Sequence, residues 1–219
     1  FKNGKRCLVC LAVRGNTHRR YTKIHAFIPL KVGWFFSTDI FTLDTQTRHG
    51  NGFHMITRCK KSGYYADNVF CDLKTDVMSK FCLMVQRMRK DPNLNQNGYP
   101  IVVSLTLDVA TEWSERCAVW TTMCSDMGIT LQYASTDDKR ANADAESAVK
   151  HLTHTAKCIL LESSLPAEWY QEAAEQARTI RNCMPLRRNI VSKDGCSLRP
   201  LEEITHGRIS REECNRTLM

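Results

Sequence analysis

The sequence predicts an α/β fold in which one mixed sheet of five strands carries helices on both faces. Three short segments with β character come first, at 34–41, 53–60 and 64–72. Helical patterns then alternate with two further apolar runs, and two more helical patterns follow them. Strands joined by short turns, followed by alternating helices and strands, are typical of a layered α/β domain.

The length and composition are those of a globular protein with a sizeable core. The chain has 219 residues, of which 42% are hydrophobic and 25% are charged, and a domain of this size buries roughly 70% of its unfolded surface. These values exclude a disordered or fibrous chain. No apolar run is long enough for a membrane helix, and the start lacks both an initiator Met and a signal peptide. We therefore expect a soluble piece of a longer protein.

Charge and cysteine content indicate the kind of partner and the compartment. The formal charge of +8 favours a polyanionic partner through counterion release, although it does not require one. The eleven cysteines are odd in number and mostly lie singly among apolar residues. This usage predicts reduced core cysteines in a reducing compartment. The cysteines concerned are Cys59, Cys71, Cys82, Cys117, Cys124 and Cys158.

The first half of the chain predicts a basic lead-in over 1–32 and then an antiparallel meander of three strands. Asn51-Gly52 lies between the first two strands, and a Lys-Lys-Ser-Gly turn lies between the second and third. Apolar residues at spacings of three and four predict a helix over 74–90. The run IVVSLTL from Ile101 is apolar enough to be a strand covered on both faces.

The second half predicts a helix over 112–127 that Gly128 ends, and a short strand over 129–134. A polar loop leads into a helix over 142–163. Pro166 begins another helix, over 166–184, and Pro185 ends it. We expect one catalytic domain over 33–185 and a basic to polar C-terminal extension over 186–219.

Three acidic residues occupy positions where strand ends and a helix can bring carboxylates together. Asp39 lies inside an apolar strand, Asp108 ends the most buried strand, and Glu146 falls near the start of a helix. If the two strands are neighbours, these acids form a cluster of hard oxygen ligands that suits Mg²⁺ or Mn²⁺. Two such ions activate and stabilise the oxygens of a phosphodiester displacement. Spacing alone leaves other acids as rivals: Asp44, Glu112, Asp137 and Asp138.

The helix over 142–163 predicts two distinct faces. One of them carries a carboxylate and a basic row. The other is an apolar stripe that consists of Ala145, Ala148, Val149, Leu152, Ala156, Ile159 and Leu160. One interpretation is an ordinary pair of Glu146 with Lys150 on a solvated face. The other is that Glu146 binds metal while the basic row follows a phosphate backbone. The candidate nucleic-acid-binding residues are Lys139, Arg140, Asn142, Lys150, His154 and Lys157.

The stretch from Arg140 to Pro185 resembles the glutamate-containing segment of copia-type retrotransposon integrases. That family has an Asn-Gly-x-Ala-Glu core, then Leu-Pro-x-x-x-Trp and an Asn-x-x-Pro ending. The matching residues here are Asn142, Ala145 and Glu146, then Leu165, Pro166 and Trp169, then Asn182 and Pro185. The tail is similar to a further family segment at Pro200, Glu202 and Gly207.

The resemblance extends to the other two acids. FFSTDIFTLD is similar to the strand that holds the family's first aspartate, at Asp39, and LTLDVATEW is similar to the second motif, at Asp108. The resemblance implies a ribonuclease H-like integrase core of a Pol polyprotein, with Asp39, Asp108 and Glu146 as catalytic residues and ligands of Mg²⁺ or Mn²⁺. It implies DNA 3′-end processing and strand transfer on retrotransposon ends and target DNA. A homo-oligomer, no membrane partner, and action in the nucleus after assembly in cytoplasmic particles are implied as well.

The sequence departs from the family pattern around two of the acids. Val109, Ala110 and Thr111 stand where the family has Asn-Gly-Gly, and Ala143 replaces a glycine beside Glu146. Arg140, Ala141 and Ser147 replace further motif residues. The alternative to an active enzyme is therefore a decayed integrase remnant that acts as a nucleic-acid-binding or assembly module.

Near the start, CLVCLAVRGNTHR resembles the cysteine half of the family's zinc-binding module, with Cys7 and Cys10 as ligands. A tetrahedral zinc site needs four ligands. His18 and His25 are possible substitutes for the family's histidines, which lie upstream of these cysteines. We expect zinc only if upstream ligands exist in the full-length protein.

Overall fold

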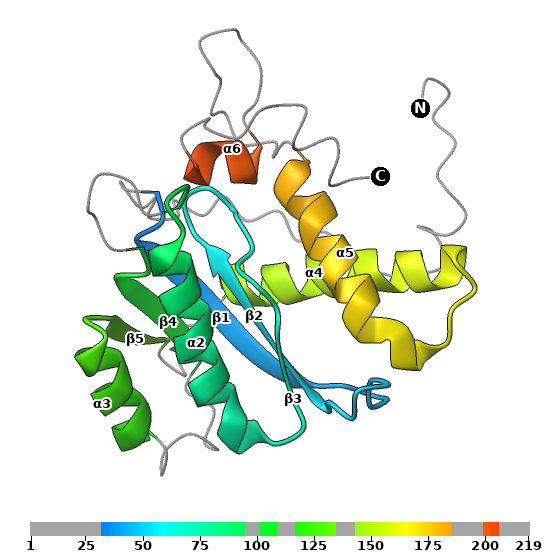
Figure 1. Ribbon diagram of the computed structural model, residues 1–219, viewed down its shortest axis with the longest axis horizontal. Coiled ribbons are helices and arrows are strands. Elements are labelled where there is room, and N and C mark those ends of the chain that lie inside the picture. The colour runs from blue at the N-terminus through cyan, green and yellow to red at the C-terminus, as the bar shows by residue number, and fades with distance from the viewer. Residues whose placement is uncertain (1–31, 95–100, 109–116, 135–142, 185–198, 206–219) are drawn as a thin grey trace, which may run out of the picture.

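The computed structural model of the chain describes residues 32–94, 101–108, 117–134, 143–184 and 199–205. Within these ranges it describes the backbone alone at Asp108, Cys117, Ala134, Glu202 and Glu203. The described residues form one five-stranded sheet in the order β3-β2-β1-β4-β5 (Figure 1). Pairing is antiparallel between β1 and β2 and between β2 and β3, and parallel on both sides of β4. The strands are β1 (Phe35–Thr42), β2 (Phe53–Cys59), β3 (Val69–Cys71), β4 (Ser104–Asp108) and β5 (Thr130–Ala134).

Helices cover both faces of this sheet, as the sequence predicts. The helices are α2 (Val77–Lys90), α3 (Cys117–Asp126), α4 (Ala143–Glu162), α5 (Tyr170–Cys183) and α6 (Pro200–Ile204). Single 3-10 turns, η1 (Lys74–Asp76) and η3 (Ala167–Trp169), lead into α2 and α5. In Figure 1, α4 and α5 cross side by side at the right of the sheet, in agreement with their direct packing. No helix in the described ranges has the length and apolarity needed to cross a bilayer.

Two hydrophobic cores lie on opposite faces of the sheet. The first packs Phe36 and Leu105 of the sheet against Phe81 of α2 and Trp120 of α3. The second packs Ile56 of the sheet against α4 and α5. Successive side chains of a strand point to opposite faces of the sheet. A strand residue that packs in one of the two cores therefore shows which face its neighbours in the strand occupy. The buried members from α4 and α5 are Ala148, Leu152, Ala156, Leu160, Tyr170, Ala173, Ala174 and Ala177.

The meander is confirmed, but its third strand is shorter than the sequence predicts. Tyr64, Tyr65 and Ala66 are buried, as the apolar pattern indicates, yet only Val69–Cys71 pairs as a strand. Before β3, Tyr65 forms a single antiparallel bridge to Arg58 of β2, through bonds made by its neighbours Tyr64 and Ala66. Asn182 pairs the backbone groups of Tyr65 itself, because its Oδ1 accepts from the Tyr65 N–H at 2.8 Å and its Nδ2 donates to the Tyr65 carbonyl at 2.9 Å. This buried amide, the asparagine of the Asn-x-x-Pro ending, therefore has a structural role.

The fourth strand begins three residues later than predicted. Val102 has a φ of 58°, which breaks the extended backbone before Ser104. The guanidinium of Arg89 stabilises this segment by donating to the carbonyls of Ile101 and Val102 at 3.1 and 3.0 Å. The run from Ile101 is nevertheless buried, so the pattern predicted its burial correctly.

The tryptophan of the Leu-Pro-x-x-x-Trp motif fixes the loop between β1 and β2 against α5. The Arg48 guanidinium lies 3.9 Å above the Trp169 ring and donates to Glu172. The Arg48 N–H also donates to the Glu168 carbonyl at 2.8 Å. Segments more than a hundred residues apart in the sequence are thereby joined at the end of β1.

Cysteines behave as the sequence predicts wherever the structure describes them. Cys59, Cys71, Cys82 and Cys124 are buried free thiols, and Cys158 is a half-buried one. Burial raises the pKa of Cys124 to about 12, so this thiol is inert at neutral pH. The side chain of Cys117 lies outside the described residues.

Candidate acidic site

Asp39 lies in the middle of β1 on the sheet face that α4 covers. Its partner across the antiparallel pair is Ile56, a member of the core under α4 and α5. Phe41, two residues further along the same face, packs against that core as well. Asp39 is half-buried, and its Oδ1 accepts a hydrogen bond from the Ile40 N–H at 2.8 Å. The carboxylate is therefore held in place at the boundary between core and solvent.

The strand register relates the position of Asp108 to that of Asp39. In the parallel pair of β1 and β4, the recorded pairing ends at Ser37 and its partner Thr106. Asp39 and Asp108, the last residue of β4, each lie two residues beyond that pair. Positions two apart in a strand lie on the same face of a sheet, so both acids occupy positions on the face that carries Ser37 and Thr106.

Glu146 lies in the first turn of α4, the helix that packs on that face. α4 contacts β1 and β2, and its buried residues belong to the stripe predicted from the sequence, of which Val149 and Ile159 are half-buried. Glu146 is exposed, as are Lys150 and Lys157 further along the helix, while His154 is half-buried and its Nε2 lies 3.8 Å from the Cys158 sulfur. No ion pair joins Glu146 to Lys150 in the described chain, so the ordinary pairing considered above does not form.

The replacement of glycine by Ala143 is compatible with the helix start. Ala143 is the first residue of α4. Among the described residues other than glycine, positive φ values occur only at Val102 and Ser164. A glycine is therefore not required at position 143, and alanine favours the helical conformation there.

Two functional candidates near the acids were missed by sequence reasoning. Lys60, just after β2, donates from Nζ to the Thr106 Oγ1 at 2.6 Å. Burial lowers the pKa of Lys60, and the carboxylate of Asp144 in α4 opposes that effect. The Ser37 hydroxyl, 1% exposed, has no hydrogen-bond partner in the described part of the chain. In the sequence, Lys60 is a lysine directly after a strand, and nothing there distinguishes it from an ordinary solvated turn residue.

The donor chemistry of this face suits a hard divalent cation. Carboxylate oxygens of Asp39 and Glu146, with the backbone position of Asp108 on the same face, form a set without cysteine or histidine. Within the described residues no group of three or more His, Cys, Asp or Glu side chains is close enough to hold a metal. The side chain of Asp108 lies outside the described residues. A site with three carboxylate ligands therefore depends on Asp108 in addition to Asp39 and Glu146.

Several sequence-predicted residues lie outside the described ranges. These include Lys139, Arg140 and Asn142 before α4, and the zinc candidates Cys7 and Cys10. Of the rival acids, Asp44 is exposed in the loop after β1, beyond Asp39. Glu112, Asp137 and Asp138 also lie outside the described residues.

A cavity of about 360 Å³ lies directly beyond the acids, between the end of β1 and α4. Phe41 and Val149 line it, and these residues follow Asp39 and Glu146 on the same strand and helix. Lys157 and Thr153 of α4 also line it. The side of α4 that begins at Glu146 therefore continues along this groove, which has apolar walls and the ammonium of Lys157 at its edge.

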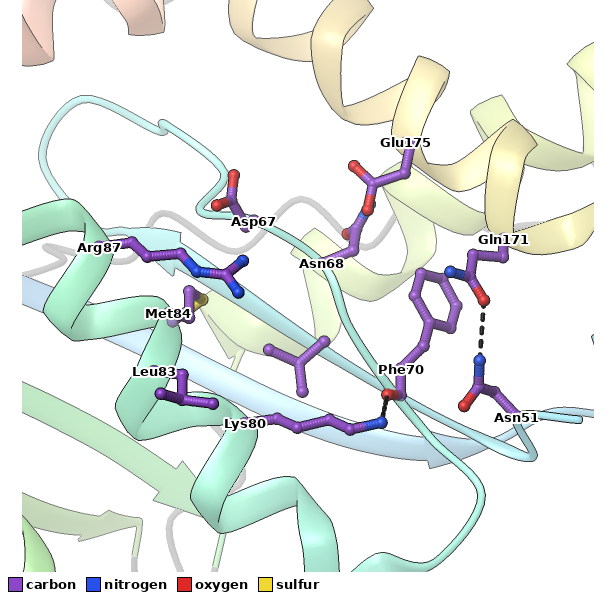
Figure 2. Close-up of a pocket in the computed structure, with 11 residues that line it drawn as sticks. Asn51, Asp67, Asn68, Phe70, Lys80, Leu83, Met84, Arg87, Gln171 and Glu175 are labelled. Carbon is purple, nitrogen blue, oxygen red and sulfur yellow. Dashed lines mark hydrogen bonds between the residues drawn. The ribbon is translucent and has the colours of Figure 1, made fainter. Parts of the chain in front are cut away.

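A second cavity, of about 380 Å³, lies between α2, β3 and α5, and none of the three candidate acids lines it. Figure 2 shows Lys80 donating to the Phe70 carbonyl at 2.7 Å and Asn51 donating to Gln171 at 2.9 Å. Asp67, Asn68, Arg87 and Glu175 complete its polar lining. This cleft is separate from the acidic site.

The structure is similar to solved integrase structures, at low sequence identity. Over 90% of this chain, it matches a chain of the cryoEM structure of the simian T-cell lymphotropic virus intasome in complex with PP2A regulatory subunit B56 gamma, with a TM-score of 0.59 and 12% identity. This chain spans 62% of the length of that chain. No family model matches the sequence, and no curated protein matches it.

Two further matches are isolated catalytic cores. The HTLV-2 integrase catalytic core domain in complex with magnesium, in its dimeric form, matches 81% of this chain and is itself 99% covered, with a TM-score of 0.51 and 12% identity. The trimeric form matches 78% of this chain, with 95% of that core covered, a TM-score of 0.50 and 12% identity. With its mixed sheet and helices on both faces, the chain therefore has the ribonuclease H-like fold of integrase catalytic cores.

Proposed function

We propose that the chain carries the catalytic core of a retrotransposon integrase of the copia type, a polynucleotidyl transferase that processes DNA 3′ ends and joins them to target DNA. One observation carries the proposal. Asp39 and Asp108 each lie two residues beyond the paired residues Ser37 and Thr106 of β1 and β4, at positions on the sheet face where α4 packs, and Glu146 lies in the first turn of α4. The fold shared with integrase cores supports it.

Asp39, Asp108 and Glu146 would hold Mg²⁺ or Mn²⁺. The HTLV-2 cores are described in complex with magnesium, and such an ion, when bound, supplies activation of the attacking oxygen and stabilisation of the leaving one. The Ile40 N–H orients the Asp39 carboxylate through its bond to Oδ1. A fixed ligand reduces the reorganisation needed when a cation binds.

The DNA partner would follow the exposed side of α4. Lys150 and Lys157 lie on that side with their side chains in solvent, and the apolar groove beyond the acids runs along the same helix. Ammonium groups at this spacing contact phosphates without reading sequence. Lys139, Arg140, Asn142 and His154 would extend this surface.

The remaining features belong to the same proposal. Residues 33–185 would form the core, with half of a zinc-binding module before it, including Cys7 and Cys10, and an extension after it. The matched integrases occur as a dimer, a trimer and an intasome, and we propose a homo-oligomer that acts on DNA in the nucleus after assembly in cytoplasmic particles.

A strand-transfer assay tests the proposal. Full-length protein is incubated with labelled duplex ends and plasmid DNA, with Mn²⁺, with Mg²⁺ or with chelator. We expect joined products that need the metal and disappear in Asp108→Asn. Salt-dependent DNA binding without any metal-dependent transfer would instead support the non-catalytic module, and transfer that persists in Asp108→Asn would contradict the assigned carboxylates.

A further inference from the structure

The groove beyond the acids is lined by two aromatic rings and by aliphatic side chains. Its walls come from the end of β1, from one side of α4 and from the start of α5. Phe41 and Tyr170 are the aromatic residues, and Val149 and Leu160 contribute aliphatic groups. The volume of about 360 Å³ is near the lower end of the range for small-molecule sites, about 300 to 1,000 Å³. A groove of this size and lining suits a single flat ring system.

Both rings are held in place by the buried imidazole of His54. The Phe41 ring packs against that imidazole at a centroid distance of 5.2 Å, and the Tyr170 hydroxyl donates to its Nδ1 at 3.3 Å. The backbone between the rings and the loop is fixed as well, since the Leu43 N–H donates to the Gly52 carbonyl at 2.8 Å. The groove is therefore preformed, which lowers the cost of filling it.

The two edges of the groove carry opposite charges. Lys157 of α4 lines one edge, and Asp44 of the loop after β1 lines the other, beside the hydroxyls of Thr42 and Thr45. Lys157 and Asp44 are exposed, and neither forms an ion pair with a residue that the structure describes. A ligand with an anionic group at one end and hydrogen-bond donors at the other matches this order of charges.

A nucleotide with an unpaired base has this arrangement of groups. The faces of a base stack on aromatic side chains whatever the sequence. Its phosphate matches the ammonium of Lys157, and the amino group of a base matches the carboxylate of Asp44, because carboxylates accept from such groups. The base must leave its pair to enter, because a base inside a duplex does not expose its faces.

The groove also lies close to the phosphodiester on which the acids would act. Phe41 is two residues beyond Asp39 on β1, which is about 7 Å along the strand. Val149 is three residues after Glu146 on α4, about 4.5 Å along the helix. A strand of duplex DNA advances about 3.4 Å per nucleotide. A base in the groove would therefore belong to a nucleotide about one or two positions from that phosphodiester.

We propose that this groove receives one unpaired base of the DNA end, with the base against the aromatic rings and its phosphate at Lys157. The inference deepens the proposed function by naming a further part of the DNA substrate, and it rests on that function for DNA as the partner. An apolar side chain of another protein would match the walls of the groove but neither of its charged edges.

DNA hairpins with one open end test the proposal on the full-length protein. Three hairpins differ only in their last nucleotides, which are paired, mismatched or abasic, so the number of phosphates is the same in all three. Fluorescence anisotropy at one salt concentration measures the affinities. We expect the mismatched end to bind about 10-fold more tightly than the abasic end, the effect of one stacked base. The paired end should bind less tightly than the mismatched end, because it must first unpair.

A bulky substitution in the groove tests where the base binds. Ala167 lines the groove and is exposed, so Ala167→Trp fills the groove without removing a packed side chain. Ala118→Trp is the matched control, because Ala118 is also exposed and lies near the start of α3, which packs on the opposite face of the sheet. We expect Ala167→Trp to bind the mismatched and abasic ends equally and Ala118→Trp to keep the difference. Urea unfolding checks that both variants are folded.

Photo-crosslinking of the wild-type protein gives a result that depends on no variant. The hairpin carries 5-iodouracil at the mismatched position, which on irradiation forms a bond to a neighbouring aromatic ring. We expect the crosslink in a peptide that contains Phe41 or Tyr170. Mass spectrometry of the digested complex identifies that peptide.

The outcomes separate this inference from the proposed function. Equal affinity of the wild-type protein for mismatched and abasic ends overturns the inference, even where strand transfer is observed. A difference that persists in folded Ala167→Trp, or a crosslink confined to other parts of the chain, overturns it as well. Base-dependent binding without strand transfer supports the inference and contradicts the catalytic part of the proposed function. A protein that binds no DNA overturns both.

Discussion

Asp39 and Asp108 occupy matching positions on two adjacent parallel strands, two residues beyond the paired residues Ser37 and Thr106. Parallel strands run in the same direction, so a register that continues beyond this pair brings the two positions side by side on one face. This relationship depends on β1 and β4 being neighbours. The sequence analysis considered that adjacency as a condition, and the strand order establishes that the two strands are neighbours.

Replacement of Asp39 by asparagine tests the role of its charge. Asp39→Asn keeps an oxygen that accepts from the Ile40 N–H, so we expect unfolding by urea to be close to that of wild type. Loss of an anionic metal ligand removes several kcal/mol of transition-state stabilisation, so strand transfer should fall by about 100-fold or more. Asp126→Asn, at an exposed acid that ends α3, is the control and should retain activity. Equal losses in the two variants would refute the assignment.

The basic row of α4 predicts a specific salt dependence of DNA binding. Each phosphate contact adds about 0.9 to the slope of log affinity against log salt concentration for duplex DNA. We expect Lys150→Gln combined with Lys157→Gln to lower that slope by about two contacts. Fluorescence anisotropy at several salt concentrations measures it, with the exposed Lys90→Gln on α2 as the control. A slope that falls equally in the control would mean that DNA does not follow α4.

Asn182 predicts a large stability loss from a small change. Its amide pairs with both backbone groups of the buried Tyr65. Asn182→Ala leaves a buried donor and a buried acceptor unpaired, and each such group costs about 1 to 3 kcal/mol. We expect the free energy of unfolding in urea to fall by about 2 to 4 kcal/mol. The control is Gln176→Ala, on the exposed side of α5, which should change the free energy of unfolding little. If Asn182→Ala lowers the free energy of unfolding no more than this control does, the backbone groups of Tyr65 find other partners.

Buried His54 predicts acid sensitivity. It stacks on Phe70 at 4.1 Å, its Nε2 donates to the Asn68 Oδ1 at 3.1 Å, and its Nδ1 accepts from the Tyr170 hydroxyl at 3.3 Å. Complete burial lowers the pKa of His54 from 6.5 to about 3. The unfolded chain therefore binds a proton that the folded chain does not between these two pH values, and stability falls as the pH falls through that window.

The size of this effect is measurable by urea unfolding at several pH values. Each unit of pH within the window costs about 1.4 kcal/mol, so His54 should account for about 2 kcal/mol of stability lost between pH 7.5 and pH 5. His54→Leu should be less stable at pH 7.5, because Tyr170 and Asn68 lose their partner, and should show a shallower dependence on pH. Identical pH slopes for the two proteins would contradict a buried neutral imidazole.

The sequence predicted burial better than it predicted hydrogen-bond partners. Apolar patterns identified the buried residues of β1, β2 and α4 because burial follows the spacing of side chains along a strand or helix. They extended the third strand through Tyr65, where the structure has only a single bridge to Arg58, and no local pattern shows that the distant Asn182 binds the backbone of Tyr65. The late start of β4 has the same origin, since Arg89 lies outside the strand whose carbonyls it binds.

The C-terminal extension shows the same limit. It was predicted only as a basic to polar segment, with no helix, yet α6 forms there and Ile204 is 2% exposed in the core beside α2. A helix of five residues is too short to produce a visible periodicity. Lys60 was missed for a related reason, because Thr106, to which its side chain donates, is distant in sequence.

Anomalous scattering from a crystal grown with Mn²⁺ tests the central claim most directly. The account predicts one or two peaks bound by carboxylate oxygens of Asp39, Asp108 and Glu146, and no peak at these residues in Asp108→Asn. Peaks confined to other acids such as Asp44 or Asp67, or no bound Mn²⁺ at all, would contradict it.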